Sequence, residues 1–193
     1  SITNKSKKEA PLTVLPTLWF YNRWAFTKDE EKPSITYIDK TSVKAKHQRL
    51  GNYYFYFQLP KDGLFTENET NMQKVNGKPN ATPFTKDAIN EAIVHGTNRA
   101  RLKAKRSGTK FSPVYKMTVP AGATKTIYSR LCNTQMENAF VTGFEKIFAT
   151  KKAEADDFYN AILPANMSSD MRAIQRQAIS GLLWSKQYYH FDI

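Results

Sequence analysis

Two groups of closely spaced carboxylates are the residues whose type and spacing could do chemistry. The first group is Glu67 and Glu69, and the second is Glu154, Asp156 and Asp157. Two carboxyl groups hydrolyse a glycosidic bond when they flank it about 5 to 10 Å apart, one as acid and the other as nucleophile or base. In an extended loop the first pair would point the same way, and the triplet is expected at a helix start, where acids favour the helix dipole. Spacing alone therefore favours structural roles over catalysis.

Few other residues could hold a metal or act as a nucleophile. Cys132 is the single cysteine, so it forms no internal disulfide and is expected to be a small buried hydrophobic residue at a strand end. Three histidines are too few for a Cys/His zinc cluster, and His190 lacks a nucleophile and an orienting acid for a triad. We therefore expect no metal and no cofactor.

Aromatic residues are abundant, with three Trp, ten Tyr and twelve Phe. An aromatic face can stack on the apolar face of a sugar ring or on a nucleobase. Trp19, Trp24 and Trp184 are therefore candidates for a binding platform, although core packing is the expected role of most aromatic residues in this chain.

The positive charge is local. The chain of 193 residues has 29 Lys and Arg against 17 Asp and Glu, and the segment 94–131 supplies nine of these basic residues and no acid. Such a run is typical of a surface that binds nucleic acid. However, Arg99, Arg101, Lys103 and Lys105 alternate with apolar residues, which predicts a strand with one solvated face. No RNA-recognition, zinc-finger or bZIP motif accompanies the run, so we favour a solvated strand-and-loop surface and keep nucleic-acid binding as the alternative.

The first two thirds of the chain predict a β-sandwich core. The segment 53–59 is the strongest strand, because its aromatic run has high sheet propensity and suggests burial on both faces. Further strands are expected at 12–20, 34–38, 114–119 and 124–131. Pro120, Ala121, Gly122 and Ala123 separate the last two and predict a hairpin.

Helices are expected to complete the chain. An apolar stripe of helical period runs from about Gly143 to Pro164, and a second helix begins near Ser168. The end of the chain, 182–193, is mostly aromatic and apolar, which indicates a surface that further packing would cover. We therefore interpret the chain as a truncated part of a larger protein.

Six segments, in this order, carry a resemblance to a known family: Val14–Trp24, Leu64–Asn71, Glu91–Gly96, Ser107–Lys110, Ala155–Pro164 and Gln175–Asp192. Together they resemble the large bacterial glucosidase-like proteins of glycoside hydrolase family 63, relatives of the mannosyl-oligosaccharide glucosidases. The most specific part is 184–192. One departure is visible, since the family pattern Leu-Trp-Phe-Arg-Asn-Thr-Trp has its Arg replaced by Tyr21 and its Thr replaced by Arg23.

The resemblance implies an architecture. Members of this family have an N-terminal β-supersandwich, a helical linker and an (α/α)6 toroid that holds the catalytic acid and base. It implies a supersandwich-type β-sandwich portion over 1–142, a linker helix over 143–166 and the truncated first helix of the toroid over 167–193. The expected fold class is therefore mainly β with C-terminal α-helices. The family's catalytic carboxylates lie downstream of the matching segments, so no catalytic residue is assigned here.

The resemblance also implies a function. The parent protein would hydrolyse α-glucosidic bonds of oligosaccharides by an inverting mechanism, and this segment would stabilise and shape the mouth of the active site. The candidate substrate-proximal residues are Trp24, Glu67, Asn68 and Glu69. The expected partners are the protein's own toroid and the oligosaccharide. The alternative is a stand-alone module that binds carbohydrate or nucleic acid through the basic segment 94–131.

Location and assembly are less constrained. The sequence has no run of 18 apolar residues and no apolar leader at its start, so no membrane partner is expected. The compartment is left open, with the cytoplasm favoured over export. Two copies of the fragment are expected to pair through exposed sheet edges.

Overall fold

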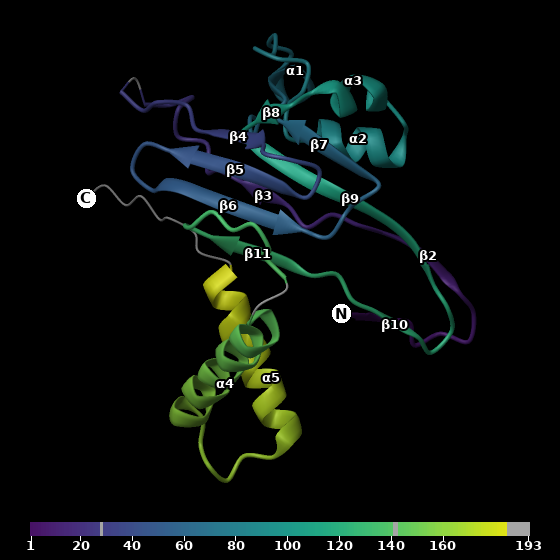
Figure 1. Cartoon of the computed structure of the whole chain (residues 1–193), viewed down its shortest axis with the longest axis vertical. Coiled ribbons are helices and arrows are strands. Elements are labelled where there is room, and N and C mark those ends of the chain that lie inside the picture. Colours follow the sequence, from purple (N-terminus) through teal and green to yellow (C-terminus); the bar gives the residue numbers. More distant parts are fainter. Residues whose placement is uncertain (28, 141–142, 185–193) are drawn as a thin grey trace. The chain divides into compact units, whose positions relative to one another are not determined.

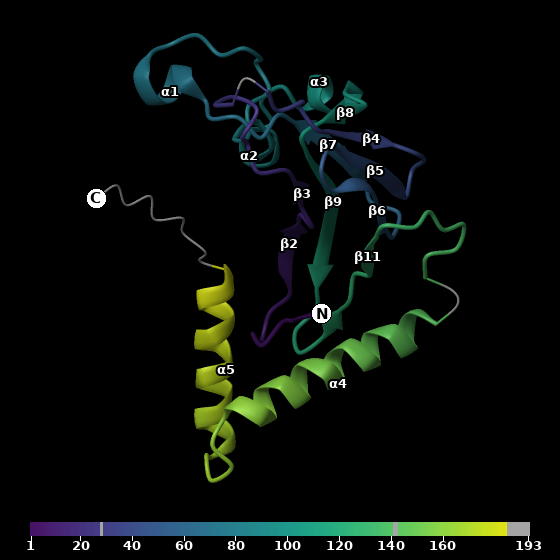
Figure 2. The ribbon, with the colours of Figure 1, turned by 90° about the vertical axis from the view of Figure 1, so that its left-hand side faces the viewer.

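The computed structural model describes residues 1–27, 29–140 and 143–184 (Figure 1, Figure 2). The chain divides into two compact units, Ser1–Phe140 and Val141–Ile193. The first is built mainly of strands, and the second contains the C-terminal helices α4 and α5. The predicted fold class, mainly β with C-terminal helices, is confirmed. Most of the predicted apolar end of the chain, with His190 and most of the segment 184–192, lies outside the described residues.

The first unit contains two main antiparallel sheets. The larger has the strand order β11-β6-β5-β4-β8, and in the smaller β9 pairs with β2, β3 and β7. A short ladder of β1 and β10 completes the pairing. The strand bounds are β1 (Ile2–Thr3), β2 (Ala10–Val14), β3 (Leu18–Trp19), β4 (Ser34–Tyr37), β5 (Ser42–His47), β6 (Gly51–Phe57), β7 (Asp62–Thr66), β8 (Ser107–Gly108), β9 (Lys110–Val119), β10 (Thr124–Lys125) and β11 (Ser129–Cys132).

Strand β9 is the axis of the smaller sheet. On one side it pairs with β2 and β3, which share a single register, since Val14 lies opposite Tyr115 and Leu18 opposite Phe111. On the other side it pairs with β7, where Phe65 lies opposite Phe111. Successive side chains of a strand point to opposite faces. The rows across β3, β9 and β7 therefore belong alternately to one face and to the other.

One face of the smaller sheet packs on the larger sheet through an aromatic core. Phe111 is fully buried, and its ring centroid lies 4.6 Å from that of Phe65, 5.3 Å from that of Phe57 and 5.4 Å from that of Tyr37. Strand β6 is buried on both faces over its last three residues, as predicted. The outward Tyr56 is covered by the segment that follows β11, because its hydroxyl accepts the N–H of Met136 at 2.6 Å.

The other face of the smaller sheet is partly covered by helices α2 (Ala88–Val94) and α3 (Arg99–Ala104), which lie beside β7 (Figure 1). Leu64 and Val114 of the sheet pack there against Ile89, Ala92 and Leu102. A short helix α1 (Met72–Asn76) precedes them and ends at Gly77, whose φ of 73° is the left-handed conformation that glycine adopts at helix ends.

The strand predicted from the alternation of Arg99, Arg101, Lys103 and Lys105 is wrong, because these residues form α3 and its C-terminal cap. Ala, Leu, Arg and Lys are all good helix formers. The alternating segment contains only one large apolar residue, Leu102, and this residue is fully buried under the helix. A single buried position fits either period, so the alternation could not decide between strand and helix.

The predicted hairpin of 114–119 and 124–131 is also wrong. The turn forms, with the N–H of Ala123 donating to the carbonyl of Pro120 at 3.1 Å. Beyond it, β10 pairs with β1 and β11 pairs with β6, so neither strand pairs with β9. Asn4 binds in the place of the hairpin partner, since its Nδ2 donates to the carbonyl of Val119 at 2.9 Å.

The second unit contains helices α4 (Phe144–Ile162) and α5 (Ser169–Trp184), which are joined by a turn (Figure 2). The sequence predicted the acidic triplet at a helix start. This prediction is wrong, because the triplet lies in the middle of α4. Asp156 forms an ion pair of 2.5 Å with Arg176 of α5. Tyr159 and Ser180 share a hydrogen bond of 2.9 Å between their hydroxyls. Asp156 of the triplet therefore contributes to the contact between the two helices, whereas Glu154 pairs with Lys151 of its own helix at 2.7 Å.

Eight large apolar residues of the two helices are exposed in the structure. They are Ile147, Phe148, Phe158, Ile162, Met171, Ile174, Leu182 and Leu183. None of the helices among the described residues has the length and apolar character needed to cross a membrane.

Phe111 lies at the centre of the aromatic core, so Phe111→Ala is expected to lower the free energy of unfolding by about 3 to 5 kcal/mol. The matched control is Phe26→Ala, because that ring is 86% exposed and its removal should change stability by less than about 0.5 kcal/mol. Urea unfolding of both variants, followed by circular dichroism, measures the difference. Equal stability of the two variants would contradict the central role of Phe111.

Candidate functional site

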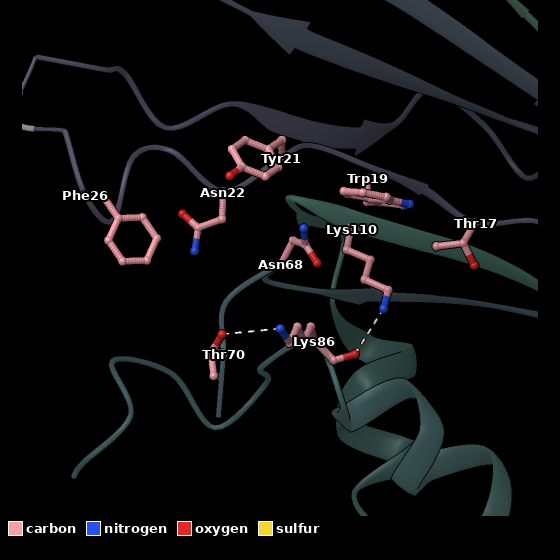
Figure 3. Close-up of a pocket in the computed structure, with 9 residues that line it drawn as sticks. All are labelled: Thr17, Trp19, Tyr21, Asn22, Phe26, Asn68, Thr70, Lys86 and Lys110. Carbon is pink, nitrogen blue, oxygen red and sulfur yellow. Dashed lines mark hydrogen bonds between the residues drawn. The ribbon is translucent and has the colours of Figure 1, made fainter. Parts of the chain in front are cut away.

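A hollow of about 590 Å³ lies in the first unit (Figure 3). Three aromatic rings, those of Trp19, Tyr21 and Phe26, line one part of it. The other lining residues are polar or charged: Thr17, Asn22, Asn68, Thr70, Lys86 and Lys110. None of these nine residues is acidic.

The alternating side-chain directions of an extended chain place the rings of Trp19 and Tyr21 in the hollow. Leu18 and Phe20 pack against the aromatic core, whereas Trp19 and Tyr21 point to the opposite face and are 52% and 74% exposed. The backbone holds this register beyond β3, because the N–H of Phe20 donates to the carbonyl of Thr109 at 3.0 Å. The expectation that most aromatic residues are core residues therefore does not hold for Trp19.

A turn places the third ring. The side-chain oxygen of Asn22 accepts the N–H of Ala25 at 3.2 Å, and the N–H of Phe26 donates to the carbonyl of Arg23 at 2.9 Å. The turn is further held by an ion pair of 3.0 Å between Arg23 and Glu30. Two neighbouring residues thus contribute to the hollow in different ways, since Tyr21 lines it and Arg23 holds its turn.

Asn68 and two lysines form the polar part of the hollow (Figure 3). The Nδ2 of Asn68 donates to the carbonyl of Phe20 at 2.8 Å, and its backbone N–H donates to the Thr109 hydroxyl at 2.7 Å. The ammonium group of Lys86 donates to the Thr70 hydroxyl at 3.3 Å. That of Lys110 donates to the backbone carbonyl of Lys86 at 3.1 Å.

A network of ion pairs lies next to Asn68 in the sequence. The ammonium group of Lys32 lies 3.2 Å from a carboxylate oxygen of Glu67 and 2.8 Å from one of Glu69. Lys105 lies 3.4 Å from Glu67, and the indole N–H of Trp24 donates to Glu69 at 3.1 Å. The two carboxylates therefore point the same way, as expected for an extended loop, and share one cation.

The network stabilises the charged forms of Glu69 and Lys32. Burial raises the pKa of Glu69, but hydrogen bonds from Lys32 and Trp24 outweigh it and hold this pKa below the ordinary 4.5. Burial also acts on Lys32, yet its bonds to Glu69 and Glu67 raise its pKa above 10.5. A carboxylate that stays ionised at neutral pH cannot donate the proton that glycoside cleavage requires. Glu69 is thus a structural anion in this arrangement.

The four predicted site residues lie close together but have different structural roles. Asn68 lines the hollow, whereas Trp24, Glu67 and Glu69 belong to the adjacent network. The network supports the hollow through the backbone, because the carbonyl of Glu69 accepts the N–H of Lys86 at 3.0 Å.

Sequence reasoning missed Tyr21, Phe26 and Lys86, and it included Lys110 only within the basic segment 94–131 of the alternative function. The alternation that places Tyr21 outward was available in the sequence. The position of Lys86 beside Lys110 was not, because the tertiary fold brings these residues together.

The basic segment 94–131 is not a uniform surface of free charge. Arg99 and Lys103 of α3 both bind Asp62 at 2.7 Å. Their hydrogen bonds outweigh the effect of burial and lower the pKa of this carboxyl. Arg106 lies over the ring of Tyr37, 4.5 Å from its centroid. Several of the nine basic residues therefore make intramolecular contacts.

Cys132 and the possible metal ligands are the remaining side chains that could do chemistry. Cys132 ends β11 as expected, but it is only partly buried, and its thiol lies 3.1 Å from the carbonyl of Thr134. Among residues 1–27, 29–140 and 143–184, no three His, Cys, Asp or Glu side chains form a group that could hold a metal ion.

The chain is similar to a protein of yeast. The chain is 32% identical over 228 residues to the uncharacterized protein YMR196W of Saccharomyces cerevisiae. The match covers 99% of this chain and 21% of the yeast protein, so the chain spans about a fifth of the length of this relative. No family model and no solved structure matches the chain.

Glu69→Gln is expected to lower the free energy of unfolding by about 1 kcal/mol at pH 7, because it removes the anion that Lys32 and Trp24 bind. Folding lowers the pKa of Glu69, so its stabilising effect is present above the ordinary 4.5 and is lost as the pH falls through the lowered value. Lys32 has a raised pKa, so its effect is fully present below 10.5. The difference in unfolding free energy between Glu69→Gln and wild type should therefore be constant between pH 4.5 and pH 10.5 and should become smaller below pH 4.5.

The measurement is urea unfolding of wild type and variant at several pH values. Glu9→Gln is the control, because Glu9 is exposed and the same charge is removed there. A Glu69→Gln effect no larger than that of the control at pH 7 would contradict the assigned role.

Proposed function

We propose that this chain is a non-catalytic β-domain segment of a larger protein similar to glycoside hydrolases of family 63, and that its hollow binds part of an oligosaccharide substrate. The observation that carries the proposal is the set of three exposed rings beside a group of amides and hydroxyls. Coverage of only 21% of the yeast relative is consistent with a segment of a longer protein. In this role the segment shapes the mouth of an active site located elsewhere in that protein.

The chemistry of the lining supports a sugar ligand. A sugar ring has an apolar face of C–H groups, which stacks on an aromatic ring, and an edge of hydroxyls, which needs hydrogen-bonding partners. Trp19 and Phe26 supply faces that are exposed to solvent, and exposed apolar groups of this size that lie together mark interaction sites. Asn68 and Thr70 supply polar atoms in the same hollow.

Hydrolysis is assigned to the remainder of the larger protein. Inverting hydrolysis needs one carboxylic acid that donates a proton and one carboxylate that activates water. The hollow has no acidic lining residue among those described, and Glu67 and Glu69 are bound by lysines. The segment therefore binds and positions in this proposal, and it does not cleave.

Nucleic-acid binding remains the second candidate, because aromatic rings and lysines also suit bases and phosphates. The basic residues 99, 103 and 105 that motivated it are paired with Asp62 and Glu67. The oligosaccharide proposal therefore has the stronger support, and separate titrations with an oligosaccharide and with oligothymidylate distinguish the two functions.

Trp19→Ala is expected to weaken binding of an α-glucosyl oligosaccharide such as maltotriose by about five- to tenfold, since stacking of this kind contributes about 1 to 1.4 kcal/mol. Titration calorimetry on the 193-residue chain measures the dissociation constant. Phe26→Ala should weaken binding as well, whereas Phe148→Ala, which removes an exposed ring of α4, should leave it unchanged. Tight binding of oligothymidylate with no measurable binding of any oligosaccharide would overturn the proposal.

The isolated chain is expected to hydrolyse neither maltotriose nor p-nitrophenyl α-glucoside, because the acid and base lie outside it. Release of glucose or of nitrophenol is followed over a day, with a commercial α-glucosidase as the positive control. Turnover that copurifies with the chain and disappears in Glu67→Gln or Glu69→Gln would contradict the non-catalytic assignment.

A further inference from the structure

The two lysines of the hollow differ from the lysines of the neighbouring network. Lys32 and Lys105 both lie within ion-pair distance of Glu67. Lys86 and Lys110 have no carboxylate within that distance among the described residues, and their ammonium groups donate only to a hydroxyl and a backbone carbonyl. The hollow is thus lined by two positive charges and by no negative charge of its own.

The surroundings of Lys110 are unfavourable for its charge. Its side chain extends from β9, opposite Trp19 in the register, and is partly buried. Burial lowers the pKa of this ammonium group, the nearby charge of Lys86 lowers it further, and Asp87 opposes these effects without reversing them. A bound anion would offset both the desolvation and the repulsion.

The position of the lysines relative to the rings restricts the ligand. Trp19 and Lys110 are paired across neighbouring strands and both line the hollow, where the Lys110 side chain extends toward the backbone carbonyl of Lys86 (Figure 3). A ligand that stacks on the indole therefore occupies the same hollow as the ammonium group. Lys86 reaches the same hollow from the segment before α2. Lysine binds phosphate and carboxylate groups as a compact charge that does not require one fixed geometry.

We propose that the hollow binds an anionic sugar, in which a phosphate or carboxylate group lies between Lys86 and Lys110 and the sugar ring contacts Trp19. This inference rests on the proposed function, since it names the class of sugar that the same hollow takes. The anion supplies the countercharge that the hollow lacks. The ring supplies the apolar face that an inorganic anion lacks.

The test compares four probes on the 193-residue chain by titration calorimetry: methyl α-glucoside, glucose 6-phosphate, glucuronic acid and inorganic phosphate. The two anionic sugars are expected to bind about tenfold or more tightly than methyl α-glucoside. Inorganic phosphate should bind more weakly than glucose 6-phosphate, because it cannot contact Trp19. The preference for the anionic sugars should decrease between 50 and 500 mM salt. The comparison of glucose 6-phosphate with glucuronic acid distinguishes a phosphate ligand from a carboxylate ligand.

Charge removal tests the two lysines directly. Lys110→Met and Lys86→Met are each expected to reduce the ratio of anionic to neutral sugar affinity to near one. Lys125→Met is the matched control, because it removes the same charge from exposed β10 and should leave the ratio unchanged. Circular dichroism reports whether each variant is folded. Lys86 is exposed, so its variant is informative even where Lys110→Met does not fold.

The outcomes separate this inference from the proposed function. Equal affinity for methyl α-glucoside and the anionic sugars overturns the inference and leaves the oligosaccharide proposal standing. Inorganic phosphate that binds as tightly as glucose 6-phosphate, with no effect of Trp19→Ala, also overturns it. Failure of every sugar and oligosaccharide to bind overturns the proposed function itself.

Discussion

The pairing of β9 on both of its sides is the constraint on which the rest of the first unit depends. Between Lys110 and Val114 this strand has β7 on one edge, and at its start it has β3 on the other. The pleat then assigns its residues to two faces. Phe111 belongs to the aromatic core between the sheets, and Lys110, the residue before it, belongs to the hollow. A shift of one residue would bury the lysine and expose the phenylalanine, so packing of the core also fixes the site.

Buried carboxylates connect the helices and loops to this sheet. Asp62 begins β7 and binds two basic side chains of α3, which holds that helix over Leu64 and Val114. Glu67 continues the same strand and binds Lys32 and Lys105. A buried carboxylate is stable only when its charge is matched. The acids of this strand therefore account for the position of several cations that, in the sequence, look like a continuous basic run.

Local patterns predicted the elements whose own residues decide their structure. The aromatic run of β6 and the long apolar stripe of α4 are examples, although the strand ends at Phe57, and Leu59 is exposed. The sequence-based predictions were wrong for segments whose secondary structure or strand pairing depends on residues far away in the sequence. Segment 124–131 pairs with β1 and β6 instead of its neighbour, and α3 forms because Leu102 has a core to enter. In the site, Asn68 was predictable, but the juxtaposition of Lys86 and Lys110 depends on the tertiary fold.

The net charge of +12 acquires a different meaning in this structure. A basic segment that binds nucleic acid keeps its cations free for phosphates. Here Arg99 and Lys103 bind Asp62, and Arg106 stacks on Tyr37. Several of the positive charges thus make intramolecular contacts that stabilise α3 and the C-terminal end of β4. What distinguishes Lys110 from these residues is its place on the face opposite the aromatic core. There the fold supplies a ring beside it and, among the described residues, no carboxylate within ion-pair distance.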